Sequence, residues 1–162
     1  VIIVLEKNKD DNICINVHDG QVKENYIIQN NDGGQAYGIR VKNGLGSGHT
    51  INFEGNKVFN FGSRALSLMG SSSNHGSYTL KNNDFVNLIE NCPFNGCDQL
   101  VDFGYTGVMT ASKLTSEGNR FYSHIADSSK LFKNNGKYTS FSLWKSTVGD
   151  QGSIISNPSS PV

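Results

Sequence analysis

Asparagine recurs at one point of a repeated pattern in this chain. Four segments superpose on a single asparagine, and the offsets between successive asparagines are 25, 27 and 36 residues. The segments are Tyr26–Asn31, Ile51–Asn56, Tyr78–Asn83 and Leu114–Asn119. Repeats of this length are typical of solenoids, propellers and arrays, in which each unit packs on its neighbours. The repeat therefore limits the fold more than any other feature of the sequence.

A second apolar stretch follows each repeated segment. These stretches are Tyr37–Val41, Ala65–Leu68, Leu100–Phe103 and Lys130–Phe132. The stretches are short, alternate with period 2 and are separated by Gly, Asn and Ser, which favours strands over helices. The repeats are also shorter than a propeller blade of about 40–45 residues. We therefore predict an all-β parallel β-helix of about five to six coils, spanning residues 1–152, with residues 153–162 as a linker or frayed end.

Charged residues beside the recurrent asparagine test the register of this stacking. The column two positions before it contains Gln29, Glu54, Lys81 and Glu117, and the column after it contains Asp32, Lys57, Asp84 and Arg120. Opposite charges on neighbouring strands contribute about 0.2–1 kcal/mol each. The same register predicts an inward column of Ile39, Leu66, Val101 and Leu131, with Arg40, Ser67, Asp102 and Phe132 facing outward.

The shared position of the asparagines predicts a buried ladder of side-chain amides, each bonding to the amides above and below. Its members would be Asn31, Asn56, Asn83 and Asn119. The alternative is that each asparagine only marks an ordinary turn.

Composition excludes several classes of function. The chain has 14 basic and 14 acidic side chains, so it lacks the cationic surplus needed to bind a nucleic-acid backbone. No run of 18 apolar residues is present, which argues against a membrane span. No metal-ligand spacing is present either.

Cys92 and Cys97 are close enough for a small disulfide, although reduced thiols are the alternative. The start at Val1, without an initiator methionine, suggests a segment of a longer chain.

The repeated pattern is an apolar strand, a Gly-Asn or Asn-Asn pair, an apolar pair and a second apolar strand. It resembles right-handed parallel β-helix proteins, namely the pectate-lyase-like group and bacteriophage tailspikes, over roughly residues 25–145. The resemblance implies right-handed coils, a polysaccharide or cell-surface glycan as ligand, a homotrimer, and an extracellular or virion location.

We expect a polysaccharide-recognising tailspike-like segment. The alternatives are a lyase or glycoside hydrolase domain and a purely structural trimeric stalk. No cofactor is expected unless the chain is a lyase, which would use Ca²⁺.

Candidate catalytic residues are few. Glycoside hydrolysis needs two carboxyl groups across the scissile bond, and Asp98 and Asp102 are the nearest pair around one predicted strand. The resemblance to pectate lyases points instead to Arg40 or Arg64 as a base beside Asp102. A solvated surface role is the alternative for each.

Aromatic side chains can bind sugars by stacking on the apolar faces of pyranose rings. Tyr105 and Phe94 lie in the longest insertion of the repeat, and insertions of this kind map to one face of a solenoid. These aromatics could equally cover a core edge or a trimer contact. We expect His49 in a turn, His124 in an inward stack, and Trp144 either closing the last coil or packing at a subunit interface.

Overall fold

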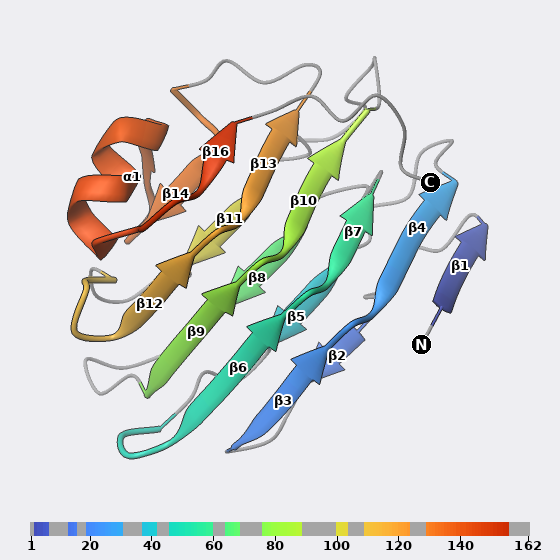
Figure 1. Cartoon of the computed structure of the whole chain (residues 1–162), viewed down its shortest axis with the longest axis horizontal. Coiled ribbons are helices and arrows are strands. Elements are labelled where there is room, and N and C mark those ends of the chain that lie inside the picture. Colours follow the sequence, from blue (N-terminus) through green and yellow to red (C-terminus); the bar gives the residue numbers. More distant parts are fainter. Residues whose placement is uncertain are drawn as a thin grey trace.

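The chain folds mainly into β-strands that pair in parallel sheets (Figure 1). The computed structural model describes residues 2–6, 13–15, 19–30, 37–41, 46–59, 64–68, 76–88, 100–103, 109–123 and 129–155. The strands are β1 (Ile2–Glu6), β2 (Ile13–Ile15), β3 (Gly20–Lys23), β4 (Tyr26–Asn30), β5 (Ile39–Val41), β6 (Thr50–Glu54), β7 (Lys57–Phe59), β8 (Leu66–Leu68), β9 (Ser77–Lys81), β10 (Asp84–Asn87), β11 (Val101–Phe103), β12 (Leu114–Glu117), β13 (Arg120–Ser123), β14 (Phe132–Asn134), β15 (Lys137–Thr139) and β16 (Ile154–Ile155). One helix is described, α1 (Phe141–Val148). The prediction of an all-β chain is confirmed.

Strands that follow one another in sequence belong to different sheets, except for β14 and β15. Sheet A has the order β1-β4-β7-β10-β13-β16, sheet B the order β15-β14-β11-β8-β5-β2, and sheet C the order β12-β9-β6-β3. The pairs are parallel except for the antiparallel pair of β14 and β15. In Figure 1 the strands of sheets C and A run almost end to end, and sheet B lies behind them. Neighbouring strands in each sheet therefore come from successive repeats of the sequence.

The core lies between the sheets and is built from alternate residues of each strand. In sheet C, Ile51 pairs with Tyr78, which pairs with Leu114, and all three are buried. In the next inward position Phe53 pairs with Leu80. Burying one such side chain contributes about 1.5–3 kcal/mol, so the stacked columns hold the sheets together.

Two details of the predicted register are wrong. Tyr26 was expected level with Ile51, but it pairs with Lys57 in sheet A, and Gly20 is the partner of Ile51. The segment Tyr26–Asn31 imitates the repeated pattern because it is an apolar strand followed by asparagines, but it occupies the position of the following strand in the repeat. In sheet B the residue level with Val101 is Phe132 rather than Leu131.

The C-terminal part of the chain closes one end of the core with helix α1. Ser140 caps the start of the helix by accepting a hydrogen bond from the Leu143 amide, and Gly149 ends it with a left-handed φ of 66°. Trp144 is fully buried, and its ring stacks on Phe103 and Phe132 with centroids 4.9 and 4.7 Å apart. Trp144 thus closes the last layer of the core, which is one of the two roles expected for it.

The segment expected as a linker begins inside the folded unit. Ser153 is buried, and Ile154–Ile155 form β16, which pairs with β13. Residues 156–162 lie outside the described part of the chain. Within the described residues, no helix has the length and apolar character needed to cross a membrane.

Candidate functional site

The bend between sheets C and A is built the same way in every repeat. The residue after each of the four sheet C strands has a left-handed φ, at Glu24, Gly55, Asn82 and Gly118, and so does Gly152, which follows the isolated bridge of Gln151 to Glu117; the five φ values lie between 52° and 68°. Glycine adopts this conformation without steric cost, and asparagine tolerates it. Gly118 has a second constraint, because a Cβ there would lie 2.4 Å from Asn82 Oδ1. The polar residue that follows each of these five residues is thereby turned toward its counterpart in the next repeat.

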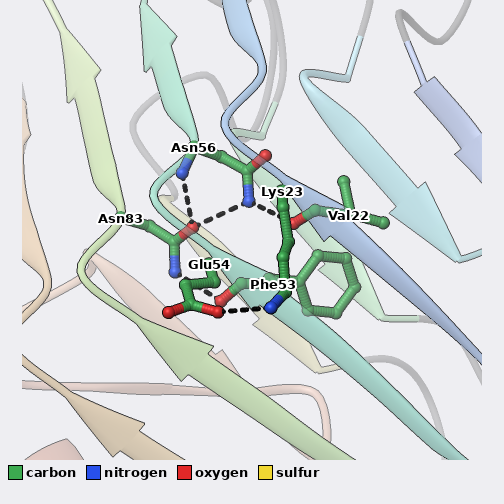
Figure 2. Close-up of polar contacts among 6 residues, drawn as sticks. All are labelled: Val22, Lys23, Phe53, Glu54, Asn56 and Asn83. Carbon is green, nitrogen blue, oxygen red and sulfur yellow. Dashed lines mark hydrogen bonds and ion pairs between the residues drawn. The ribbon is translucent and has the colours of Figure 1, made fainter.

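These polar residues form a hydrogen-bonded series that we call the asparagine ladder: Asn25, Asn56, Asn83, Asn119 and, at the end, Ser153. Figure 2 shows one step, in which Asn83 Oδ1 accepts from the backbone amide and from Nδ2 of Asn56, at 3.0 and 2.9 Å. Asn83 Nδ2 also donates to the carbonyl of Phe53. Each internal amide therefore uses its donors and its acceptor, so its burial leaves no polar atom unsatisfied.

The ladder starts at a residue that the sequence repeat did not indicate. Asn25 Nδ2 donates to Asn56 Oδ1 at 2.9 Å, in the position expected for Asn31. Asn31 itself lies outside the described residues. At the other end, Ser153 Oγ accepts from the Asn119 amide and donates to Asp150 Oδ2. Ser116 also donates to this buried carboxylate.

Charges on the outer face of sheet C follow the same register. Lys23, Glu54, Lys81 and Glu117 pair on successive strands. Ion pairs join Lys23 to Glu54 at 2.7 Å and Lys81 to Glu117 at 3.5 Å. The hydrogen bond from Lys23 lowers the pKa of Glu54 below its usual value. Lys23 thus takes the place expected for Gln29, whose backbone pairs with Leu5 in sheet A. The ladder and this column are internally matched, which indicates a structural role.

The outer face of sheet B carries a different set of side chains. Arg40, Ser67, Asp102 and Lys133 pair on successive strands. The residues on both sides of Arg40, Ser67 and Asp102, and the residue before Lys133, belong to the core, so these four side chains face away from it. The expected outward position of Phe132 is wrong, because the register shift places Phe132 in the core and Lys133 outward.

Arg64 connects this row to Tyr37. Arg64 Nε lies 2.7 Å from Asp102 Oδ2, and Arg64 Nη1 donates to the Tyr37 hydroxyl at 3.2 Å. The Cζ atoms of Arg40 and Arg64 lie 4.6 and 5.5 Å from the centroid of the Tyr37 ring, within cation–π range. We call Tyr37, Arg40, Arg64, Asp102 and Lys133 the Tyr37 cluster.

Gly38 allows the close backbone packing on which the cluster depends. Its amide donates to the carbonyl of Arg64 at 2.9 Å. A Cβ at this position would lie 2.3 Å from Val58 Cγ1 and 2.6 Å from the carbonyl oxygen of Ala65. A larger residue would push the Tyr37 segment away from Arg64, so Gly38 holds two repeats together at the site.

Burial dominates the electrostatics of Asp102. The residue is 6% exposed, and this desolvation raises the pKa of its carboxyl, while Arg64 and Lys133 act in the opposite direction. The side chain of Arg64 is 13% exposed, and Tyr37 and Arg40 are partly exposed. The cluster thus has a buried acid beneath partly accessible cations and an aromatic ring.

This arrangement has two chemical capacities. Guanidinium groups bind carboxylate and sulfate groups through paired N–H donors, and an aromatic face can pack on a sugar ring. A carboxyl group with a raised pKa can also hold a proton for transfer. As described, the cluster contains one carboxylate, whereas glycoside hydrolysis requires two.

Several predicted site residues fall outside the described part of the chain. They are Asp98, Phe94, Tyr105, His124, Cys92 and Cys97. The cluster therefore brings together three of the predicted residues, Arg40, Arg64 and Asp102. Tyr37 was missed as a functional residue, although its place three residues before Arg40, at the start of a repeated strand, was visible in the sequence.

His49 lies directly before β6 and has an acidic neighbour. Its Nδ1 atom lies 2.8 Å from Asp19 Oδ2, and Asp19 Oδ1 accepts from the Thr50 amide at 2.6 Å. This contact joins two repeats at the start of sheet C. No group of three or more His, Cys, Asp or Glu side chains suited to a metal ion occurs within the described residues.

Comparisons of the chain with family models, with curated proteins and with solved structures found no match.

Proposed function

We propose that this chain is a right-handed parallel β-helix segment that recognises polysaccharide, as part of a tailspike-like receptor-binding or depolymerase protein. The order of strands in the three sheets supports this architecture, because each sheet takes one strand from every repeat. Parallel crossover connections are overwhelmingly right-handed, which supports the handedness. The proposal includes a homotrimer at an extracellular or virion surface.

The observation that carries the function is the Tyr37 cluster. Two guanidinium groups lie within cation–π range of its aromatic ring, a combination suited to a sugar that carries an acid group. The outer face of sheet C is instead occupied by lysines and glutamates that pair with each other. The ligand proposed is therefore an acidic polysaccharide at the outer face of sheet B.

A polysaccharide lyase or hydrolase is the second candidate, and the raised pKa of Asp102 favours it. In a lyase, Arg40 or Arg64 would act beside Asp102, and Ca²⁺ would neutralise the uronate. A hydrolase would need a second carboxylate, for which Asp98 remains the candidate.

Retention on immobilised acidic and neutral polysaccharides tests the proposal. We expect the protein to retain acidic polysaccharides, and the Arg40→Gln variant to retain them at least about fivefold less well, because one charge-assisted contact is lost. Lys57→Gln is the matched control, since it removes the same charge from sheet A. Equal retention by both variants, or no retention by the unmodified protein, would contradict the proposal.

The same samples distinguish binding from cleavage. New reducing ends without absorbance of unsaturated uronate indicate hydrolysis, and unsaturated products indicate a lyase. Retention without either product supports recognition alone. The absence of both retention and cleavage leaves the structural stalk.

A further inference from the structure

We infer that Asp102 is an internal counter-ion that competes with an acidic ligand for Arg64, so the Tyr37 cluster binds anions more tightly when Asp102 is protonated. This inference rests on the proposed function, because it concerns the regulation of the same site. It makes Asp102 a residue that sets affinity and its pH range, without direct contact to the ligand.

The geometry places Asp102 in competition with any anion that approaches Arg64. The carboxylate occupies the Nε face of the guanidinium at 2.7 Å, and the Tyr37 hydroxyl accepts from Nη1. A ligand carboxylate or sulfate binds a guanidinium best through two parallel N–H donors. Because Asp102 holds Nε, an anion that binds through the paired donors Nε and Nη2 must share or displace it.

The charged groups around Asp102 come from three neighbouring elements. Arg64 precedes β8, Lys133 is the residue level with Asp102 on β14, and Arg40 lies two strands away on β5, beyond Ser67. Tyr37 is the other titratable group of the cluster. In the described part of this face, two cations therefore act directly on the carboxylate, and a third lies two strands away.

The direction of the effect follows from these charges. In its ionised form, Asp102 repels an anion and holds Arg64. Its protonation removes one negative charge from a buried position, where charges are poorly screened. Because burial raises the pKa of Asp102, this change occurs at a higher pH than in a solvent-exposed carboxyl, and affinity for an anion should rise as the pH falls through that pKa.

Inorganic sulfate is a suitable first probe, because it keeps its charge over the relevant pH range. We expect its affinity for the unmodified protein to rise by roughly tenfold between about pH 7 and about pH 4. The Asp102→Asn variant should bind sulfate at neutral pH as tightly as the unmodified protein does in acid, and with no pH dependence. Affinity that is independent of pH, or unchanged by Asp102→Asn, overturns the inference.

Asp84 offers the matched control on another sheet. It forms an ion pair with Arg120 at 2.7 Å, and that guanidinium also donates from Nε to Asp84. Asp84→Asn removes the same charge from the chain but not from sheet B. We expect sulfate binding by this variant to keep the pH dependence of the unmodified protein. A loss of that dependence would indicate an effect of net charge and would overturn the inference.

A second measurement needs no variant. Coupling between two sites is reciprocal, so an anion that prefers protonated Asp102 must raise the pKa of that carboxyl. The carboxyl carbon of Asp102, followed by NMR with increasing sulfate, should titrate at progressively higher pH. An unchanged titration midpoint at saturating sulfate overturns the inference.

The two proposals fail in different ways. Absence of sulfate binding at every pH overturns the inference, even if the protein retains polysaccharide on another face. Sulfate binding with the expected pH dependence, but no retention of any polysaccharide, overturns the proposed function and leaves an anion site of another purpose.

Discussion

The asparagine ladder and the Tyr37 cluster both join successive repeats through polar side chains, but the hydrogen-bond partners of these side chains differ. In the ladder, each amide meets the same group one repeat away, as Asn56 meets Asn83. In the Tyr37 cluster, unlike residues meet across repeats, as Arg64 meets Tyr37 and Asp102. The ladder is a contact that repeats along the stack, whereas the Tyr37 cluster occurs once, on the face that we propose for ligand binding.

Asn83→Ala should have the largest effect on stability. The substitution removes the acceptor used by two nitrogens of Asn56 and the donor used by the Phe53 carbonyl, all at a buried position. Unsatisfied buried groups cost about 1–3 kcal/mol each, partly relieved by relaxation, so we expect a loss of about 3 kcal/mol in the free energy of unfolding. Urea denaturation measures this loss.

The neighbouring Asn82 provides the control for the ladder. Asn82 is exposed and has a left-handed φ of 54°, so Asn82→Gly should change the free energy of unfolding by less than about 0.5 kcal/mol. If both variants lost the same stability, the bend itself, rather than the amide ladder, would hold the repeats together.

Arg64→Met tests the cluster and should have an intermediate effect. The variant leaves the Asp102 carboxylate buried without its ion pair, which should cost about 1–3 kcal/mol near neutral pH. Arg64 lowers the pKa of Asp102 against the effect of burial, so without Arg64 this pKa rises further. The folded variant then takes up a proton more readily, and the stability difference from the unmodified protein should shrink as the pH falls through that pKa.

Urea denaturation at several pH values measures this dependence. The double variant Arg64→Met, Asp102→Asn removes both charges of the pair. It should be more stable than Arg64→Met at neutral pH. The free energy of unfolding of the double variant should also depend on pH much less than that of Arg64→Met does. A stability difference that stays constant with pH would contradict the role assigned to the ion pair.

The regular part of the molecule was largely predictable from sequence, because stacked strands require like residues at equal offsets. The recurrence of Asn56, Asn83 and Asn119 at one point of the pattern is visible in the sequence, and their hydrogen bonds follow the same order. The first copy was misplaced because Tyr26–Asn31 has the same composition as a ladder segment. Only the pairing of Tyr26 with Lys57 shows that Asn25 starts the ladder.

The irregular parts were less accessible to prediction, for physical reasons. The register placed Arg40, Ser67 and Asp102 in one outward row, as the pairing of β5, β8 and β11 shows. The contact between Arg64 and Tyr37 depends on how far two side chains reach outside the strands, which no periodicity encodes. Helix α1 was also missed, although Ser140 and Gly149 are residues typical of helix caps.

Lys81→Glu should have the smallest effect on stability. It tests the repeating charge column of sheet C rather than the Tyr37 cluster. The variant places an acid between Glu54 and Glu117, its neighbours on β6 and β12, and like charges directly opposite each other are unfavourable. These side chains are about half exposed, with values between 41% and 53%, so solvent weakens the repulsion. We expect melting temperatures in the order unmodified protein, Lys81→Gln, Lys81→Glu at low salt.

High salt separates repulsion from lost packing. At about 1 M salt the screening length falls to about 3 Å, so the difference between Lys81→Gln and Lys81→Glu should nearly vanish. A difference that persists would mean that Lys81 stabilises through its aliphatic stem. Sulfate binding should be unaffected in both variants, because Lys81 lies on sheet C and the Tyr37 cluster on sheet B. A change in sulfate binding would show that the repeating column and the Tyr37 cluster are coupled, which would contradict a separation between stacking and the proposed recognition.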